Sequence, residues 1–268
     1  MSVQTLYTAA TGMESLQTKL DVIANNLANV NTSGFKKGRA NFEDLFYRHE
    51  TLPGAEDSAG GLTPTGISIG LGSRVSSVQT NFSQGAFQQT GGSLDVAIEG
   101  PGFFQVTDPA SGGTLYTRTG NFSINADGNI VLGSASTGRV LAPAIPIPRE
   151  ATGIVISAEG VVSYREPGSA TLTEAGTFSL AQFVNPEGLL KIGENLYAET
   201  GAAGPPTVGN PGTPGMGTLR QNALEASNVE PVQELIDLIT TQRAFELNSQ
   251  AVQAGDQVLQ LIGNLRRF

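Results

Sequence analysis

Apolar residues near the N-terminus recur with the spacing of one helix face. From Leu6 the intervals alternate between three and four residues without a break, as they do along the seam of a heptad repeat. The seam contains Leu6, Ala9, Met13, Leu16, Leu20, Ile23, Leu27 and Val30. It ends at residues 29–34 (NVNTSG), where Asn and Gly favour the end of a helix. The pattern therefore predicts a long N-terminal helix.

The C-terminal residues carry two apolar stripes instead of one. Ser227 and Glu230 fit a capping box, and the helix predicted to begin there runs to about Leu265 without a proline after Pro231. One stripe recurs every seven residues and contains Leu238, Phe245, Val252 and Leu259. The other lies on nearly the opposite face and contains Ala244, Leu247, Ala251, Ala254, Val258, Leu261 and Leu265. A surface helix of a monomer needs one such stripe, so the second predicts contacts with other chains.

The residues between these helices alternate short β-type runs with turn signals. Asp127-Gly128, Glu159-Gly160 and Glu187-Gly188 each stand between two such runs, and we expect a hairpin at each. Residues 94–106 (LDVAIEGPGFFQV) predict a strand, a turn and a second strand. The middle of the chain is therefore expected to form short antiparallel strands.

We predict an α+β fold in which the two terminal helices pair as an antiparallel coiled coil and a central antiparallel β domain is inserted between them. The expected segments are an N-terminal helix over 1–34, an extended connector over 35–74, a β domain over 75–200, a Pro/Gly-rich return connector over 201–226 and a C-terminal helix over 227–268. Residues 201–217 contain six Gly and four Pro, which is typical of a connector.

Composition and charge argue against several classes of protein. The net charge of −9 does not suit a nucleic-acid binder, which needs clustered Lys and Arg. Lys36, Lys37 and Arg39 form a small basic cluster, expected on a solvated or subunit-contact surface. No run of about 18 apolar residues suggests membrane insertion, and the N-terminal residues do not resemble a cleavable secretory signal.

Candidate catalytic chemistry is weak throughout the sequence. Cys is absent and His49 is the single histidine, so thiolate and multi-histidine metal sites are excluded and a catalytic triad has one possible centre. Glycines at 66–72 resemble a phosphate loop only loosely, because no Lys follows them. We therefore predict neither enzymatic activity nor a catalytic, cofactor-binding or metal site.

Charge is scarce in the N-terminal helix, where only Glu14, Lys19 and Asp21 are charged between Met1 and Gly34. A free coiled coil usually carries Glu and Lys beside its seam. Helices that pack on several sides in a polymer would explain both the missing charge and the second stripe, and open head-to-tail contacts generate helical filaments. A monomeric helical hairpin with a neutral surface is the alternative.

Several strings resemble the rod and hook axial proteins of bacterial flagella. Residues 20–36 (LDVIANNLANVNTSGFK) are similar to the N-terminal rod motif, and residues 227–260 to the C-terminal motif of that family. Residues 95–106, 116–132 and 192–200 resemble its distal rod members. The likeness extends over nearly the whole chain.

The resemblance implies a structural subunit of the distal rod, a rigid hollow helical tube that transmits motor torque across the periplasm to the hook and encloses the export channel. It implies export through the flagellar type III apparatus without a cleavable signal peptide. The implied partners are further copies of the chain, with proximal rod proteins and hook protein along the axis. The P and L ring proteins are further candidates. A proximal rod or hook paralogue, a wall-degrading enzyme on an axial scaffold and a monomeric β-rich binding module are the alternatives.

The resemblance also assigns packing roles to residues. On the N-terminal helix we expect subunit packing by Leu6, Met13, Leu16, Leu20, Ile23, Leu27 and Val30. On the C-terminal helix we expect it by Leu238, Phe245, Leu247, Val252, Val258, Leu259, Leu261 and Leu265. A rod-type stretch at 46–66, expected to help make the rod rigid, contains Phe46, Tyr47, Pro53, Gly54, Pro64 and Gly66.

Overall fold

The computed structural model describes residues 3–54, 56, 61, 64–109, 112–133, 138–168 and 171–265. These residues form two compact units, both discontinuous in sequence. Unit 1 is drawn from residues 1–28, 38–80 and 230–268, and unit 2 from residues 29–37 and 81–229. The chain therefore passes between the units four times.

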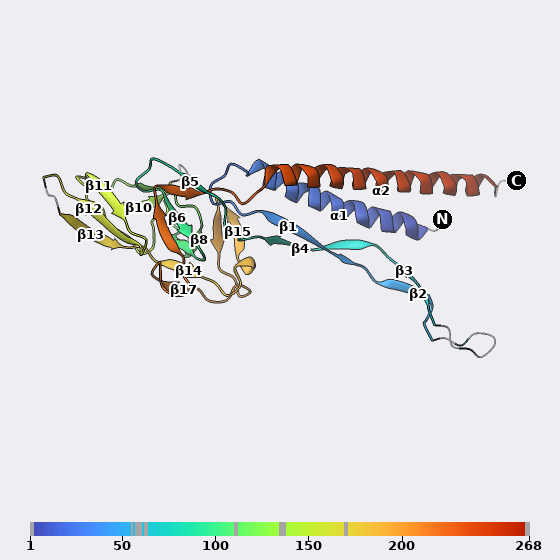
Figure 1. The fold of residues 1–268 in the computed structure, drawn as a ribbon. Helices are drawn as coiled ribbons and strands as arrows, with labels where there is room; N and C mark the ends of the chain where they lie inside the picture. Colours follow the sequence, from blue (N-terminus) through green and yellow to red (C-terminus); the bar gives the residue numbers. More distant parts are fainter. Residues whose placement is uncertain are drawn as a thin grey trace. The chain divides into compact units, whose positions relative to one another are not determined.

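Unit 1 contains both long helices and a two-stranded ribbon (Figure 1). Its elements are α1 (Val3–Ala28), β1 (Gly38–Asp44), β2 (Tyr47–Thr51), β3 (Ile67–Gly70), β4 (Ser73–Thr80) and α2 (Pro231–Leu265). The helix predicted near the C-terminus begins at Pro231, because the Ser227 hydroxyl accepts a hydrogen bond from the Val229 amide instead of capping the helix from 227. Within the described part of the chain, neither helix is long and apolar enough to cross a membrane.

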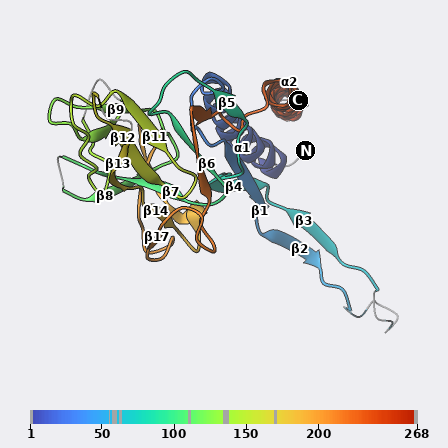
Figure 2. The same ribbon diagram turned by 60° about the vertical axis from the view of Figure 1, so that its left-hand side comes forward.

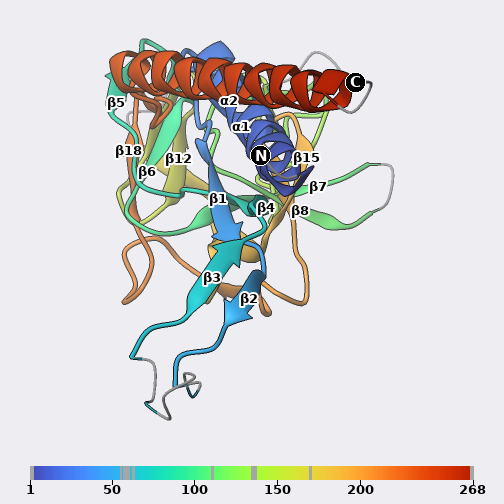
Figure 3. The ribbon, with the colours of Figure 1, turned by 90° about the vertical axis from the view of Figure 1, so that its right-hand side faces the viewer.

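The four strands of unit 1 form one long antiparallel ribbon (Figure 3). β1 pairs with β4, and β2 pairs with β3. The two pairs are joined because the Leu45 amide donates to the Gly72 carbonyl at 2.9 Å and the Leu71 amide to the Phe46 carbonyl at 3.1 Å. Near this junction the Ser15 hydroxyl of α1 donates to the Ser73 carbonyl at 3.3 Å, so α1 holds the β1–β4 end of the ribbon.

The expected coiled-coil pairing of the two helices is wrong, although the coarse α+β class holds. α1 and α2 contact one another, but their innermost residues are Ser15 and Asn26 on α1 and Glu234, Thr241 and Gly255 on α2, with Ile23 the one large apolar side chain among them. A coiled coil needs a continuous apolar seam on both helices. Here α1 divides its inner face between α2 and the ribbon, so its Leu and Met side chains are only half-buried.

Unit 2 contains the remaining strands (Figure 2). They are β5 (Phe87–Gln89), β6 (Val96–Glu99), β7 (Phe103–Thr107), β8 (Thr114–Thr117), β9 (Phe122–Ile124), β10 (Ile130–Leu132), β11 (Gly153–Ile156), β12 (Val161–Arg165), β13 (Leu172–Thr177), β14 (Leu180–Gln182), β15 (Leu190–Gly193), β16 (Leu196–Ala198), β17 (Thr207–Gly209), β18 (Thr218–Gln221) and β19 (Ala223–Glu225). A short 3₁₀ helix spans Pro186–Gly188.

Every strand pair of unit 2 is antiparallel. The largest sheet has the order β15-β16-β8-β7-β14-β17, and β11-β12-β13 form a smaller sheet. The pairs β9–β10, β6–β18 and β5–β19 complete the unit. β17 pairs with the nearby β14, whereas β18 and β19 pair with β6 and β5, so residues 218–225 are bound to strands that lie more than a hundred residues earlier in the chain.

Two cores stabilise unit 2. The larger is centred on Phe104, whose ring meets the rings of Phe122 and Phe178. The smaller is aromatic and contains Phe103, Tyr116, Phe183 and Tyr197. Phe103 and Phe104 are neighbours on β7, so alternation along this strand sends one side chain to each core.

Two of the three expected hairpins are confirmed. β9 and β10 pair around Asp127-Gly128, and β11 and β12 pair around Glu159-Gly160. The third is wrong, because residues 186–188 form the 3₁₀ helix and the flanking strands β14 and β15 pair with other strands. Residues 94–106 give β6, a turn and β7 as expected, but the two strands join different sheets.

Candidate subunit-packing surfaces

α2 exposes an apolar stripe along the face turned away from α1. The stripe, called here the outward stripe, consists of Val232, Leu235, Ile236, Ile239, Leu247 and Leu261. Val232 is 71% exposed, Leu247 65% and Leu261 63%. Helix geometry, with about 100° per residue, places this stripe roughly opposite the buried positions 234, 241 and 255. Apolar surface of this extent on a helix is typical of a protein contact.

The predicted packing residues of the C-terminal helix divide between two environments. Leu247, Leu259 and Leu261 are exposed, and Leu247 and Leu261 belong to the outward stripe. Leu238, Phe245, Val252 and Val258 are half-buried. Leu265 ends α2, and its side chain lies outside the described residues. The predicted packing residues did not include the first four residues of the outward stripe, which are Val232, Leu235, Ile236 and Ile239. Their spacing places them on the same face of α2 as Leu247 and Leu261.

The predicted residues of the N-terminal helix lie toward its inner side. Ile23 is buried, and Leu6, Met13, Leu16, Leu20 and Leu27 are half-buried. Val30 follows α1 in a turn and belongs to unit 2. The exposed aromatic residue of α1 is Tyr7, which is not part of the predicted seam.

Polar groups fix the contact between α1, α2 and the ribbon. The Asn26 side chain exchanges two hydrogen bonds of 2.9 Å with the backbone of Gly38, accepting from its amide and donating to its carbonyl. The same amide nitrogen donates to the Glu234 carboxylate at 3.2 Å. Both side chains are buried, so one amide sets the position of β1 and of α2 against α1. Apolar periodicity gives no signal for such a contact.

The predicted rod-type stretch forms the β2–β3 end of the ribbon. Phe46 is 86% exposed, Tyr47, Pro53, Gly54 and Pro64 are also exposed, and Gly66 is half-buried. Residues 55, 57–60, 62 and 63 of the stretch lie outside the described residues. His49 of β2 is exposed, with its Nδ1 atom 2.9 Å from the Ser68 hydroxyl. The ribbon thus presents aromatic and aliphatic side chains on a pair of strands with little cover.

Lys36 has a different environment from the surface position expected for the basic cluster. Its side chain is completely buried, and its Nζ atom lies 2.5 Å from Oε1 of Glu225, which is also completely buried. Burial lowers the pKa of Lys36 and of Arg118 below their ordinary values, and the Glu225 carboxylate opposes both shifts. No local pattern predicted a partner for Lys36, because Glu225 lies 189 residues away in the chain.

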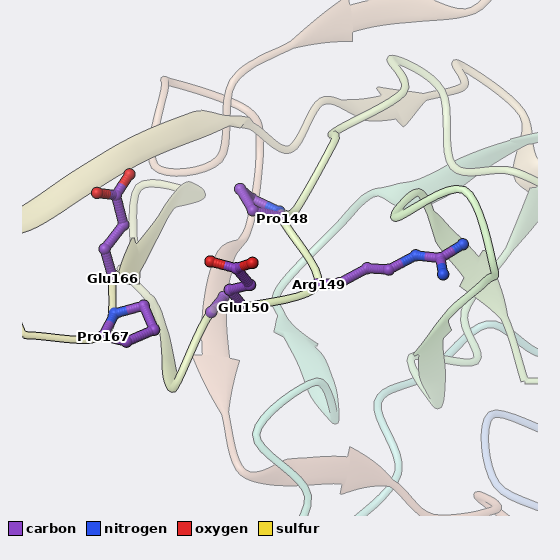
Figure 4. Close-up of a pocket in the computed structure, with 6 residues that line it drawn as sticks. Pro148, Arg149, Glu150, Glu166 and Pro167 are labelled. Carbon is purple, nitrogen blue, oxygen red and sulfur yellow. The ribbon is translucent and has the colours of Figure 1, made fainter.

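A hollow of about 350 Å³ lies on unit 2 and is lined by Pro148, Arg149, Glu150, Ala151, Glu166 and Pro167 (Figure 4). Arg149 points away from the two carboxylates and donates to the Ala126 carbonyl. Among the described residues, no group of three His, Cys, Asp or Glu side chains could hold a metal ion.

Three family models match separate parts of the chain. Residues 6–36 match the model described as flagella basal body rod protein. Residues 97–164 match the flagellar hook protein FlgE/F/G D1 domain, and residues 220–265 match the flagellar basal body rod FlgEFG protein C-terminal model. The first of these regions covers α1 from residue 6 onward, and the last contains α2.

Curated relatives match over nearly the full length. The flagellar basal-body rod protein FlgG of Agrobacterium fabrum is 44% identical, with 97% of this chain and 98% of the relative covered. The protein of the same name from Bacillus subtilis is 40% identical, with 99% and 100% covered. The flagellar basal-body rod protein FlgF of Caulobacter vibrioides is 35% identical, with 90% and 89% covered.

Proposed function

The chain belongs to the flagellar basal-body rod protein family and is a structural subunit of the flagellar rod, and from this premise we propose how it packs there. Copies of unit 1 associate through α1 and α2 to form the wall of a hollow helical tube in the distal rod. The tube encloses the export channel and carries motor torque across the periplasm to the hook. The observation that carries this proposal is the outward stripe of α2.

Burial of the outward stripe is the main source of the proposed association. Each Leu, Ile or Val side chain that moves from water into a contact stabilises it by about 1.5–3 kcal/mol. The gain is offset in part by the lost freedom of the subunit, and several neighbours in a helical array share that cost. If the outward stripe of one copy contacts a different surface on the next copy, the contact is head-to-tail. Repeating such a contact generates a helical filament when the rotation between copies does not close into a ring.

The exposed β2–β3 end of the ribbon supports a second contact. A two-stranded ribbon is only marginally stable by itself in water, and this one carries Phe46 and Tyr47 in exposed positions. We assign its apolar side chains to contacts with neighbouring copies, which would brace the tube against bending. The predicted packing residues of both helices are assigned to the same wall.

Other finer assignments remain part of the proposal. The chain assembles with other rod and hook components of the basal body, and we place proximal rod proteins and hook protein at its axial contacts, with the P and L rings as further candidates. Its role is structural and not enzymatic. It reaches the periplasm through the type III export apparatus without signal cleavage. The five segments predicted from the sequence are kept as a proposed division of the assembled subunit.

The proposal is tested in a strain that lacks its own rod subunit. Wild-type chain, Ile239→Asp and Leu247→Asp are each expressed, and rods are counted in isolated basal bodies by electron microscopy. We expect both charged variants to reduce rod number at least about tenfold, since a buried unpaired carboxylate costs several kcal/mol.

Gln242→Asp is the matched control, because it adds the same charge to an exposed position of α2 beside the outward stripe. This variant should assemble normally. Normal rods from Ile239→Asp and Leu247→Asp would show that the outward stripe is not a packing surface. Failure of the wild-type chain to restore rods would contradict the proposed role in the rod itself.

A further inference from the structure

Three segments far apart in sequence meet where the chain enters and leaves unit 2. The chain passes from unit 2 to unit 1 after Lys37, returns at Asn81 and leaves again after Val229. These three of the four crossings, two where the chain leaves unit 2 and one where it re-enters, are called here the exits of unit 2. The Asn81 amide donates to the Lys37 carbonyl at 2.9 Å, so two of the exits are in direct contact.

A buried ion pair joins the segments next to the exits. Lys36 Nζ lies 2.5 Å from Glu225 Oε1 and also donates to the Ser83 carbonyl at 2.7 Å. Glu225 Oε1 accepts a further hydrogen bond of 2.8 Å from the Gly85 amide. The Glu225 backbone carbonyl accepts from the Gly34 amide at 2.7 Å. One glutamate therefore connects the residues before the first exit to those after the second.

Arg118 adds a second cation to the same carboxylate. Its Nη1 atom lies 3.9 Å from Glu225 Oε2, and its Nη2 atom donates to the Gly100 carbonyl at 2.9 Å. The guanidinium also lies over the ring of Phe103, 5.6 Å from its centroid. Neither Arg118 Nη1 nor Glu225 Oε2 makes a hydrogen bond within the described residues, so this contact is held by charge. Among those residues, Glu225 is the carboxylate that serves both buried cations.

Asn228 connects all three exits with one side chain. Its Oδ1 atom accepts from the Lys37 amide at 2.8 Å. Its Nδ2 atom donates to the Asn81 carbonyl at 2.9 Å and to the Ser83 carbonyl at 3.1 Å. Asn228 itself lies directly before the last residue of unit 2.

We propose that Lys36, Arg118, Glu225 and Asn228 form a clasp that holds the three exits of unit 2 at fixed spacing, so that force is passed through them together. This inference rests on the proposed rod function and assigns these four as positioning residues in it. The clasp joins Lys36, the last residue matched by the rod-protein model, to residues of the matched C-terminal region. It therefore connects the two regions whose helices are assigned to the wall of the rod.

Buried charge suits such a clasp better than apolar contact would. The hydrophobic effect is non-directional, so burial of aliphatic surface does not by itself select one arrangement. A buried ion pair with directional hydrogen bonds has one satisfactory arrangement, and any slip leaves a charge unpaired. The exits are thus held in one relative position when load is applied to them.

The test is amide hydrogen exchange of the full chain, read at single residues. In Glu225→Gln we expect the amides of Gly34, Lys37, Asn81 and Gly85 to exchange roughly a hundredfold faster, because removing one partner of a buried pair leaves two cations without a counter-charge. The exchange rates of amides in β7 and β8 should change less than about threefold.

Asn228→Ala leaves no charge unpaired. In this variant, exchange of the Lys37 and Asn81 amides should be faster, while the Gly85 amide stays protected. Glu166→Gln, an exposed carboxylate of the same unit, is the control and should leave all of them unchanged.

Each result supports or overturns the clasp. Exchange at the exits equal to wild type in both variants overturns it. Parallel acceleration of every amide in unit 2, in Asn228→Ala as well, shows a general contribution to stability and also overturns it. In the strain lacking its own rod subunit, local loosening should accompany at least about a tenfold loss of rods per cell. Rods at wild-type number with loosened exits would refute the mechanical role alone, whereas failure of the wild-type chain would refute the proposed function.

Discussion

Small and polar residues decide the closest contacts of unit 1. Gly72 joins the two strand pairs of the ribbon with a φ of +122°, a conformation that side chains rarely adopt. A Cβ atom at this position would also overlap the Thr11 hydroxyl of α1. Position 72 therefore requires glycine for two reasons, which are its positive φ and the close approach of α1. Neither requirement is visible in an apolar pattern.

We predict that Gly72→Ala lowers the free energy of unfolding of unit 1 by about 1–3 kcal/mol, because strain and overlap add. Urea unfolding followed by helical circular dichroism measures the loss. Gly54→Ala is the control, since Gly54 has a φ of +81° but open space around its missing side chain. Equal losses in the two variants would mean that contact with α1 contributes nothing.

Among the elements, α2 has one side that contacts α1 and another side that carries the outward stripe. Val252 is half-buried and lies one turn from Asn248 and Gly255, which contact Gly12 and Leu6 of α1. Leu247 belongs to the outward stripe. A charge placed on one side should therefore act on the folded chain, and a charge on the other side on assembly.

We predict that Val252→Asp lowers the thermal midpoint of the isolated chain by several degrees, because the carboxylate enters the contact with α1. Leu247→Asp should leave the midpoint within about one degree. Scanning calorimetry of the two monomers makes the comparison. Equal midpoints would show that α2 does not use these two sides differently.

The sequence predicted elements where local signals are strong. Alternation and Gly-containing turns located the strands around Gly128 and Gly160, and the second predicted stripe of the C-terminal helix included Leu247 and Leu261, which are exposed. Sequence patterns did not predict contacts between polar side chains or between residues that are far apart in the chain. Apolar spacing suggested a coiled coil, but Asn26 and Glu234 occupy the centre of the helix contact. Lys36 read as a surface charge because its partner comes from the other end of unit 2.

The Pro/Gly-rich residues 201–217 show a similar limit. Their composition is typical of a connector, yet they supply β17 at the edge of the large sheet and Ala203 to the aromatic core. The Gly217 amide donates to the Pro101 carbonyl at 2.7 Å, which ties the segment to the turn before β7. Glycines at 204, 212 and 215 have positive φ and make the turns that this path needs. Composition gave the turns but not the strands they connect.

In the whole molecule, the two units differ in how far they bury their apolar side chains. Unit 2 buries apolar residues in two cores of its own, whereas α2 leaves the six apolar residues of the outward stripe exposed on unit 1. This difference between a unit with its own cores and a unit with an exposed apolar stripe supports the proposed packing of the chain in the flagellar rod. We propose that other copies of the chain cover the outward stripe of α2 in the rod.

The most direct test uses the absence of cysteine from the sequence. Leu247→Cys introduces a single thiol on the outward stripe, and its maleimide labelling is measured in the purified monomer and in isolated rods. Gln242→Cys, beside the stripe, and Glu166→Cys, on unit 2, are labelled in parallel for comparison. Rapid labelling of Cys at 247 in the monomer and at least about tenfold slower labelling in rods is the result we predict. Equal rates in monomer and rods would contradict the claim that the outward stripe is a subunit-packing surface.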